Sequence, residues 1–273
     1  MCRPDLAGAL RDFLETPARQ ASVLDQVAHR PWPVPPGSWV QAQTWDDLLF
    51  AHWRVSEQQV RAAVPSQLQV DTFEGSAWLG ITPFRVGGLR VRGLPPVPGV
   101  SSFLELNVRT YVTYEDKPGI WFFSLDAGSA LAVEGARRTY RLPYFRARMA
   151  ARREGDWISY RSARAEGEAR PFVWEARYRP TGPAAPALAG TREHFLAERY
   201  CLYTIDGEDR LARAEIHHPP WPLQPAEVEI ELNTMAPTAV ELPDDEPLLH
   251  FAARQDVVIW PLEPVAGGRG GYY

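Results

Sequence analysis

The sequence predicts one α+β domain that consists mostly of antiparallel β-strands. Short runs rich in apolar and β-branched residues recur from Leu68 onward, and brief turns containing glycine separate them, which is the pattern of successive β-hairpins. The chain has 273 residues, of which 45% are hydrophobic, so it can bury a sizeable core. β-rich domains of this length are commonly single units, so one domain is expected and two smaller domains are the alternative.

The two ends of the chain are expected to lie outside that domain. Residues 6–14 and 22–28 show loosely helical spacing of apolar residues, and the prolines from Pro31 to Pro36 then break the pattern. We therefore expect a helical extension and Pro-rich linker over residues 1–38, the domain over 39–265, and a flexible glycine-rich tail over 266–273.

The domain is expected to open with a strand over residues 40–45, which Asp46 and Asp47 end. The apolar run 48–55 fits either a strand or a short helix. Ser56 is typical of a residue that caps a helix, and Pro65 would end that helix.

Two hairpins should follow. The first joins residues 68–73 to 76–84 through Glu74 and Gly75, and the second joins 104–114 to 120–126 through a turn with Lys117 exposed at its tip. The Gly/Pro-rich stretch 87–99 between them is expected to be a rim loop.

The second half is expected to contain one central helix among strands. Residues 130–141 have helical spacing, with Ser129 as the cap and Pro143 just beyond the end. Strands are expected over 144–151, 156–165, 171–178, 199–205 and 211–217, with a short helix over 191–197.

Composition argues against several function classes. The net charge of −5 gives no general attraction to nucleic acid or anionic membranes. Neither a signal-peptide pattern nor an apolar run of membrane-spanning length is present, so a cytoplasmic protein is expected. Cys2 and Cys201 stand far apart, which favours neither disulfides nor a cysteine zinc site. The chain lacks a Gly-x-x-x-x-Gly-Lys loop and a Gly-x-Ser-x-Gly elbow, and no cofactor is expected.

One predicted strand has a polar face. Glu105, Asn107, Arg109 and Tyr111 alternate with apolar residues and therefore point to the same side, toward either solvent or a cavity. An inward glutamate is costly to bury unless it is used or fully bonded. Glu105 and Arg109 are thus either pocket residues or a structural ion pair.

The histidines suggest packing more than chemistry. His52 is interpreted as a hydrogen-bonded core residue. His217 and His218 are neighbours on a strand and point to opposite faces, so they cannot easily hold one metal ion. A site with His250 or Asp256 is conceivable, but no metal site is predicted.

Beside the central helix, Asp126 and Arg137 are expected to form a buried pair that holds the helix on the sheet, with a chemical role as the alternative. Tyr140 and Tyr144 are expected either at a cavity mouth or in ordinary packing. Five tryptophans are expected in the core: Trp45, Trp53, Trp78, Trp121 and Trp157.

Several segments resemble the YqjF-like family, which is known as domain of unknown function number 2071. They are 45–53, 64–65, 70–84, 105–112, 119–126, 137–140, 142–144 and 217–224, and the resemblance covers about residues 39–235. That family is similar in fold to the acetoacetate decarboxylase-like superfamily. The resemblance implies a strongly bent, mostly antiparallel sheet or barrel around a closed central cavity, with one or two helices.

The resemblance also locates a chemical difference. The decarboxylases have two lysines directly after a proline, and one of these lysines forms the imine. The matching segment here reads Arg141-Leu-Pro-Tyr144-Phe145, so the proline is present and the two lysines are not. Lys117, the only lysine, lies elsewhere. A Schiff-base decarboxylase is therefore excluded, although the Tyr144 phenol can donate or transfer a proton and Arg146 can bind a carboxylate.

Two functions are consistent with these patterns, and the sequence does not decide between them. The first is binding of a small organic acid or carbonyl compound in the cavity, with the expected ligand-binding residues Glu105, Asn107, Arg109, Tyr111, Tyr140, Tyr144 and Arg146. The alternative is lysine-independent acid–base catalysis, of a lyase, isomerase or hydrolase type, with Glu105 and Tyr144 as candidate catalytic residues. A homodimer through edge strands is a possible assembly.

Overall fold

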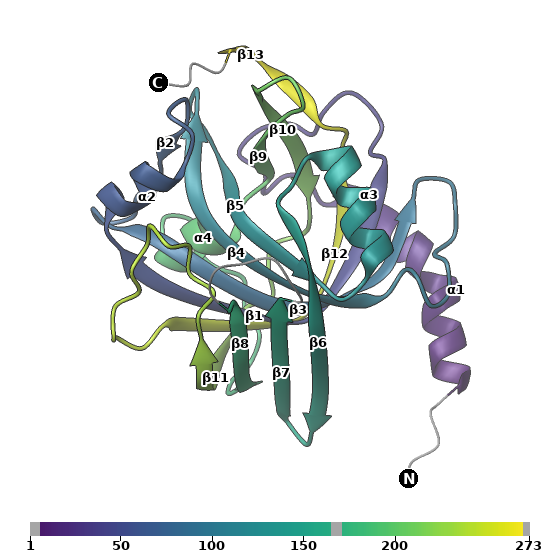
Figure 1. Ribbon diagram of the computed structural model, residues 1–273. Coiled ribbons are helices and arrows are strands. Elements are labelled where there is room, and N and C mark those ends of the chain that lie inside the picture. Colours follow the sequence, from purple (N-terminus) through teal and green to yellow (C-terminus); the bar gives the residue numbers. More distant parts are fainter. Residues whose placement is uncertain (1–5, 165–170, 270–273) are drawn as a thin grey trace.

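The structure is a computed structural model that describes residues 6–164 and 171–269 (Figure 1). Within these residues the helices are α1 Leu6–Ser22, the 3-10 helix η1 Val23–Asp25, α2 Glu57–Ala63, α3 Ala130–Tyr140 and α4 Arg192–Ala197. The strands are β1 Gln41–Val55, β2 Gln69–Val70, β3 Ala77–Val91, β4 Phe103–Tyr114, β5 Lys117–Ala127, β6 Tyr144–Glu154, β7 Trp157–Arg164, β8 Val173–Pro180, β9 Cys201–Ile205, β10 Arg210–His217, β11 Gln224–Asn233, β12 Leu248–Ile259 and β13 Glu263–Arg269.

The 13 strands form one strongly bent sheet that closes on itself. The strands β1, β3, β4, β5, β9, β10 and β12 make a ring, because β4 pairs with β5 and β10 also pairs with β12. The strands β6, β7, β8 and β11 arch from β5 back to β12, and they extend below the ring in Figure 1. Only the pairings of β5 with β6 and β9 are parallel among those described. The predicted fold class is confirmed.

The first strand is longer than predicted. Asp46 and Asp47 do not end it, because Asp47 adopts a φ of 56° and the pairing with β3 shifts register between Asp46 and Ala51. Aspartate tolerates the left-handed region better than most residues, and a bulge bends a strand without ending its pairing. The run 48–55 is therefore the second half of β1.

The first predicted hairpin is wrong apart from its turn. Glu74 and Gly75 have φ values of 51° and 73°, and Phe73 and Ser76 form a single bridge across them. Beyond that bridge β2 pairs with β4, not with β3. The expected rim loop is also shorter, because β3 runs on to Val91.

A glycine allows that extension of β3. Gly88 has a φ of 56°, and a Cβ atom there would lie 2.6 Å from Cγ2 of Thr16 in α1. A side chain at this position would thus be strained and would also clash with the Thr16 side chain of α1.

The second hairpin is present, but Lys117 is not exposed at its tip. The turn consists of Glu115 and Asp116, so Lys117 is the first residue of β5. Its ammonium lies 2.9 Å from Oε1 of Glu215 on β10 and 4.7 Å from the Trp32 ring centre. The N-terminal linker and β10 therefore cover a side chain that the local turn pattern placed in solvent.

The central helix is confirmed. The Ser129 hydroxyl accepts a hydrogen bond of 3.3 Å from the Ala132 amide, and the helix ends at Tyr140 before Arg141, whose φ is 52°. The predicted strands over 144–217 and the helix α4 are also present. Sequence reasoning missed β11, β12 and β13, and β13 includes residues 266–269 of the expected tail.

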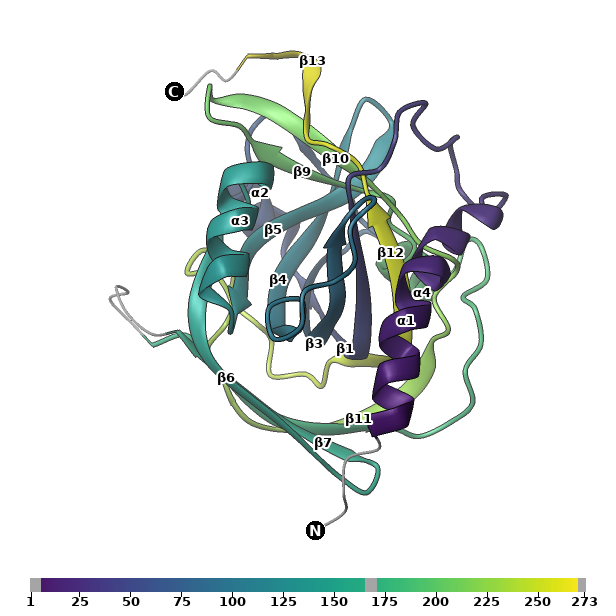
Figure 2. The ribbon, with the colours of Figure 1, turned by 90° about the vertical axis from the view of Figure 1, so that its right-hand side faces the viewer.

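The N-terminal extension packs against the ring. Arg19 forms an ion pair of 2.7 Å with Asp256 on β12, and Arg30 forms one of 2.9 Å with Glu215. In Figure 2, α1 and α3 stand on opposite sides of the ring. No helix within the described residues is long and apolar enough to cross a membrane.

Candidate functional site

A cavity of about 80 Å³ lies inside the ring, between α3 and the strands β1, β4, β5 and β9. Apolar and aromatic side chains form most of its wall, including Phe84, Phe122, Leu125 and Trp221. Because one water molecule needs about 10–15 Å³ of such space, the cavity has room for several waters or a small organic molecule.

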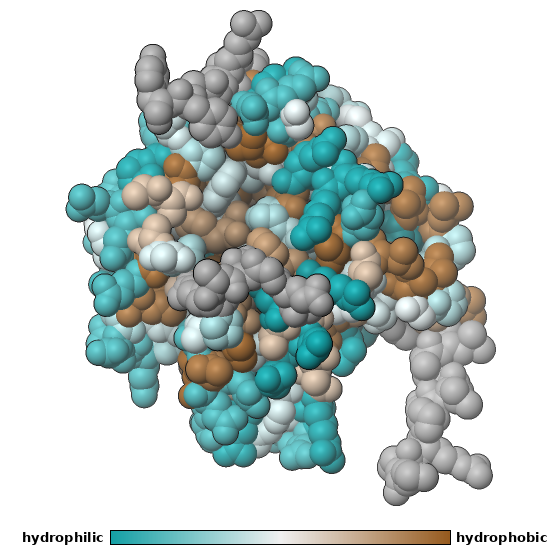
Figure 3. All heavy atoms as spheres, viewed as in Figure 1, coloured by the Kyte–Doolittle hydropathy of each residue, from teal (hydrophilic) through white to brown (hydrophobic). Residues whose placement is uncertain are grey.

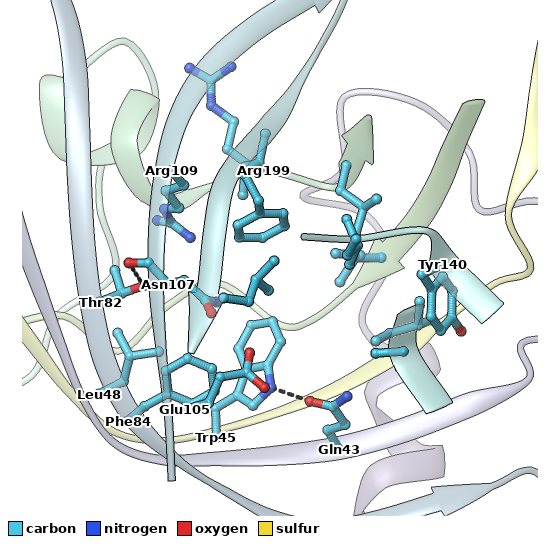
Figure 4. A pocket seen from close by; sticks show the side chains of 18 of the residues that line it. Gln43, Trp45, Leu48, Thr82, Phe84, Glu105, Asn107, Arg109, Tyr140 and Arg199 are labelled. Carbon is cyan, nitrogen blue, oxygen red and sulfur yellow. Dashed lines mark hydrogen bonds between the residues drawn. The ribbon is translucent and has the colours of Figure 1, made fainter. Parts of the chain in front are cut away.

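The strand β4 supplies three polar side chains to this apolar space. Glu105, Asn107 and Arg109 alternate along the strand and point into the cavity, and Tyr140 lies opposite them on α3 (Figure 4). The exposed fractions of Glu105, Asn107 and Arg109 are 4%, 8% and 7%, respectively. The polar face of the strand thus faces a cavity and not solvent.

Glu105 and Tyr144 meet at one end of the cavity. The order of the sheet brings them together, because Glu105 pairs with Ala127 of β5 and Leu125 of β5 pairs with Tyr144 of β6. The Tyr144 phenol donates a hydrogen bond of 3.1 Å to Oε2 of Glu105.

The surroundings of this pair keep both groups protonated near neutral pH. Burial raises the pKa of the Glu105 carboxyl to about 8, and hydrogen bonds with Tyr144 and Asn107 partly offset this rise. Burial, followed by the proximity of Glu105, raises the pKa of Tyr144 well above its usual value. The pair therefore holds protons that it can donate in hydrogen bonds.

Arg109 lies further along β4. Its guanidinium donates to the Leu196 carbonyl at 3.2 Å and to the Tyr111 hydroxyl at 3.4 Å, and it lies 5.2 Å from the centre of the Phe50 ring. Its buried Nε has no hydrogen-bond partner, and none of the ion pairs among the described residues includes it. This arrangement leaves a buried positive charge without a negative partner.

Asn107, between Glu105 and Arg109, is also incompletely bonded. Its side-chain Oδ1 is buried without a partner, while its backbone carbonyl accepts a weak hydrogen bond of 3.5 Å from Thr82. Buried polar atoms are bonded in the great majority of cases, so two unpaired atoms on one cavity wall indicate a missing polar partner.

Two further polar residues come from the chain around α4 and β10. Arg199 forms an ion pair of 2.6 Å with Asp71, so its charge is already balanced. His218 lies 3.2 Å from the Arg199 carbonyl through Nε2, and burial lowers its pKa. Both residues line the cavity, but neither has a buried side-chain atom without a hydrogen-bond partner, as Asn107 and Arg109 have.

Two of the expected ligand-binding residues lie outside the cavity. Tyr111 shares the face of Glu105, but its hydroxyl donates 2.8 Å to the Leu196 carbonyl and lies 2.6 Å from Nε2 of His52, so it packs under α4. Arg146 on β6 is exposed on the outer surface. The structure brings the other five together around one space: Glu105, Asn107, Arg109, Tyr140 and Tyr144.

Sequence reasoning did not place Gln43, Trp45, Thr82, Arg199, His218 and Trp221 in the cavity wall. Trp45 had been expected in the core. The His217–Gln224 segment contained a usable signal, because neighbouring residues of an extended segment face opposite ways. His217 binds the Val23 carbonyl at 2.9 Å on the outer side, whereas His218 faces inward.

Other expected contacts take different partners. Asp126 pairs with Arg164 at 2.7 Å, and Arg137, its expected partner, donates 2.7 Å to the Tyr144 carbonyl. The latter bond attaches α3 to the start of β6 and so supports Tyr144. Among the described residues, no cluster of three or more His, Cys, Asp or Glu side chains is arranged to hold a metal ion.

The sequence comparisons agree with this architecture. Residues 42–256 match the model of domain of unknown function 2071, a family described as an uncharacterized conserved protein. The chain is also 49% identical over 230 residues to the uncharacterized protein YqjF of Bacillus subtilis (strain 168), which covers 84% of this chain and 94% of YqjF. The chain belongs to the YqjF-like family.

Solved structures place the YqjF-like fold beside that of acetoacetate decarboxylase. The enduracididine biosynthesis enzyme MppR complexed with pyruvate has a TM-score of 0.59 at 11% identity, over 87% of this chain and 93% of MppR. Acetoacetate decarboxylase from Legionella pneumophila has a TM-score of 0.57 at 13% identity, over 89% of this chain and 95% of the decarboxylase. At such identities the likeness shows the fold alone.

Proposed function

We propose that this YqjF-like protein binds a small organic acid or carbonyl compound in the cavity, without forming an imine. The observation behind the proposal is the buried guanidinium of Arg109, which lacks an ion-pair partner and has an unpaired Nε at the cavity wall. A buried charge is costly unless it is paired, and a carboxylate is the group that best matches a guanidinium.

The rest of the β4 wall fits the remainder of such a ligand. The unpaired Oδ1 of Asn107 accepts a hydroxyl or amide hydrogen bond. Glu105, whose pKa is raised to about 8, stays protonated at neutral pH and donates to a carbonyl or hydroxyl oxygen. The wall thus offers a cation for the acid group and neutral donors and acceptors beyond it.

The cavity size and the structural neighbours agree with a small ligand. A volume of about 80 Å³ suits a molecule of a few heavy atoms. The similar structure of MppR holds pyruvate, a small oxo acid. An imine is not part of the proposal, because Tyr144 lines the cavity at the position of the expected lysine, while Lys117 is bound to Glu215.

Two measurements test the proposal. Native mass spectrometry of the purified protein, compared with its denatured mass, detects a retained ligand, and thermal-shift screening with small mono- and dicarboxylic acids detects exchangeable ones. Arg109→Gln should weaken acid binding by about 10-fold or more, whereas the matched variant Arg146→Gln, on the outer surface, should bind within about twofold of the wild type. Equal binding by Arg109→Gln and wild type would contradict the proposal.

A second candidate is acid–base catalysis on a carbonyl compound. It is favoured by the contact of 3.1 Å between Tyr144 and Glu105 together with the raised pKa of Glu105, since a general acid or base works best when its pKa is near the ambient pH. The test is deuterium exchange at the carbon next to the carbonyl of oxo acids, followed by NMR. Exchange that disappears in Glu105→Gln would support catalysis. If the protein accelerates exchange of none of the acids that it binds, the catalytic candidate is contradicted.

A further inference from the structure

An apolar groove of about 310 Å³ adjoins the cavity on its α3 side. The β3–β4 connection forms one wall with Leu94, Val97 and Val100, and α3 forms the other with Leu131 and Ala132. In Figure 3 apolar atoms gather beside α3, where this connection lies in Figure 1. The groove is therefore an open apolar surface between a helix and a loop.

The side chains of this groove are unusually exposed for their type. Leu94 is 60% exposed, Val97 is 56% and Leu131 is 69%. Single exposed aliphatic residues are common on protein surfaces, but here they face one another across one depression. Gly135, on the groove side of α3, leaves further space, because an added Cβ there would have nothing within 4 Å.

The groove and the cavity share part of their walls. Gln41, Gln43, Ala136 and Tyr144 line both of them. Tyr144 also donates to Glu105 inside the cavity, so the junction lies beside the polar end of the β4 wall. A ligand that extends along the β4 wall to Glu105 therefore reaches the apolar groove at this end of the cavity.

We infer that the ligand is amphiphilic: its acid head occupies the cavity near Arg109 and Asn107, and a hydrocarbon chain lies in the groove between α3 and residues 92–102. This inference rests on the proposed function and names its substrate class as carboxylic acids with an apolar chain. The side-chain amides of Gln41 and Gln43 at the junction offer hydrogen bonds to a polar group between head and chain.

A chain-length series tests the inference. Straight-chain carboxylates of two to sixteen carbons are titrated into the full-length protein by calorimetry, so that the longer chains reach from Arg109 past Glu105 into the groove. For the wild type, each methylene that enters the groove should tighten the dissociation constant by about fourfold, because burying one methylene removes a fixed apolar area from water. Primary alcohols of the same chain lengths are titrated as controls, and their affinities show how much of the binding does not require a carboxylate.

Gly135→Phe is the decisive variant. A Cβ atom added at Gly135 has no protein atom within 4 Å, so the ring can extend into the groove, and replacing a helical glycine does not cost helix stability. It should abolish the chain-length dependence while leaving the affinity for acetate and propionate within about twofold. The control Glu134→Phe puts the same ring on an exposed, neighbouring position of α3 and should keep the wild-type dependence.

The outcomes separate the inference from the function on which it rests. Affinity that does not change with chain length, or that rises equally in Gly135→Phe, overturns the groove as the tail site while short acids still support the cavity. Binding of none of the acids overturns both. A wild-type dimer that Gly135→Phe dissociates, measured by light scattering, would assign the groove to a second copy and overturn the inference.

Discussion

The Tyr144 phenol donates a hydrogen bond of 3.1 Å to the Glu105 carboxyl across the sheet, and both side chains are buried in an apolar cavity. Tyr144 begins β6 at the position where the sequence resemblance expects a lysine. A phenol in place of an amine changes the charge of the site, because it leaves a neutral donor beside a carboxylic acid. The pair therefore places a phenol and a carboxylic acid, and no amine, at this end of the cavity.

The first prediction concerns the ionisation of Glu105. Burial raises its pKa to about 8 and the Tyr144 hydrogen bond opposes that rise, so Tyr144→Phe should raise the pKa further. The carboxyl signal of Glu105, followed by carbon-13 NMR or infrared difference spectra against pH, measures it. A pKa near the ordinary glutamate value in the wild type would contradict the buried geometry.

The second prediction is a pH dependence of stability. Because the folded-state pKa of Glu105 is raised, its contribution to stability is complete below the unfolded pKa of about 4.3 and is lost as the pH rises toward 8. Glu105→Gln should remove this loss, which is on the order of 5 kcal/mol across the window. Urea unfolding of both proteins at pH 5, 7 and 9 compares them, and parallel pH curves would count against a buried carboxyl.

The third prediction separates binding from stability at Arg109. Without ligand, Arg109→Met should unfold at the same free energy or up to about 1 kcal/mol higher, because it removes an unpaired buried charge. The contrasting variant is Arg199→Met, which strands the carboxylate of Asp71 and should cost about 2 kcal/mol or more. Denaturant titration of both variants is the measurement, and a large loss in Arg109→Met would indicate a structural arginine.

The fourth prediction concerns Lys117. The protein is incubated with pyruvate and cyanoborohydride, which reduces any imine to a stable adduct, and is then analysed by peptide mapping. Lys117 should remain unmodified after an incubation that fully modifies the cavity lysine of a decarboxylase treated in parallel. The physical reason is that its ammonium is bound to Glu215 and lies over Trp32, and Lys117 is not among the described residues that line the cavity. Stoichiometric trapping at Lys117 would show that the chain around it opens to substrate.

The fifth prediction concerns the N-terminal extension. Arg30 has a side chain only 1% exposed and binds Glu215, so Arg30→Met should destabilise the protein by about 2 kcal/mol. Arg54→Met is the control, because its pair with Glu74 is exposed and should matter by less than about 0.5 kcal/mol. Thermal unfolding compares the two. Equal melting temperatures for Arg30→Met and wild type would make residues 1–38 a dispensable appendage.

Some features were predictable because their causes are local. The cap at Ser129 and the helix after it depend on a few neighbouring residues, and so does the alternation that puts Glu105, Asn107 and Arg109 on one face. The missing lysine is likewise a property of the chain alone. Local patterns failed where distant strands decided the outcome, as at β2, whose partner is β4 and not the strand across its own turn.

The sequence by itself therefore determined a mostly antiparallel β protein, a polar face on β4 and an absence of imine chemistry at Tyr144. Only the tertiary structure decided that this face lines a cavity, that Tyr111 and Arg146 lie outside it, and that Arg199 and His218 lie within it. The reason is that the closure of the whole sheet decides whether a given face of a strand lies against solvent, a cavity or the core. That closure pairs residues as far apart in the sequence as Gln41 on β1 and Ile259 on β12, which no local pattern specifies.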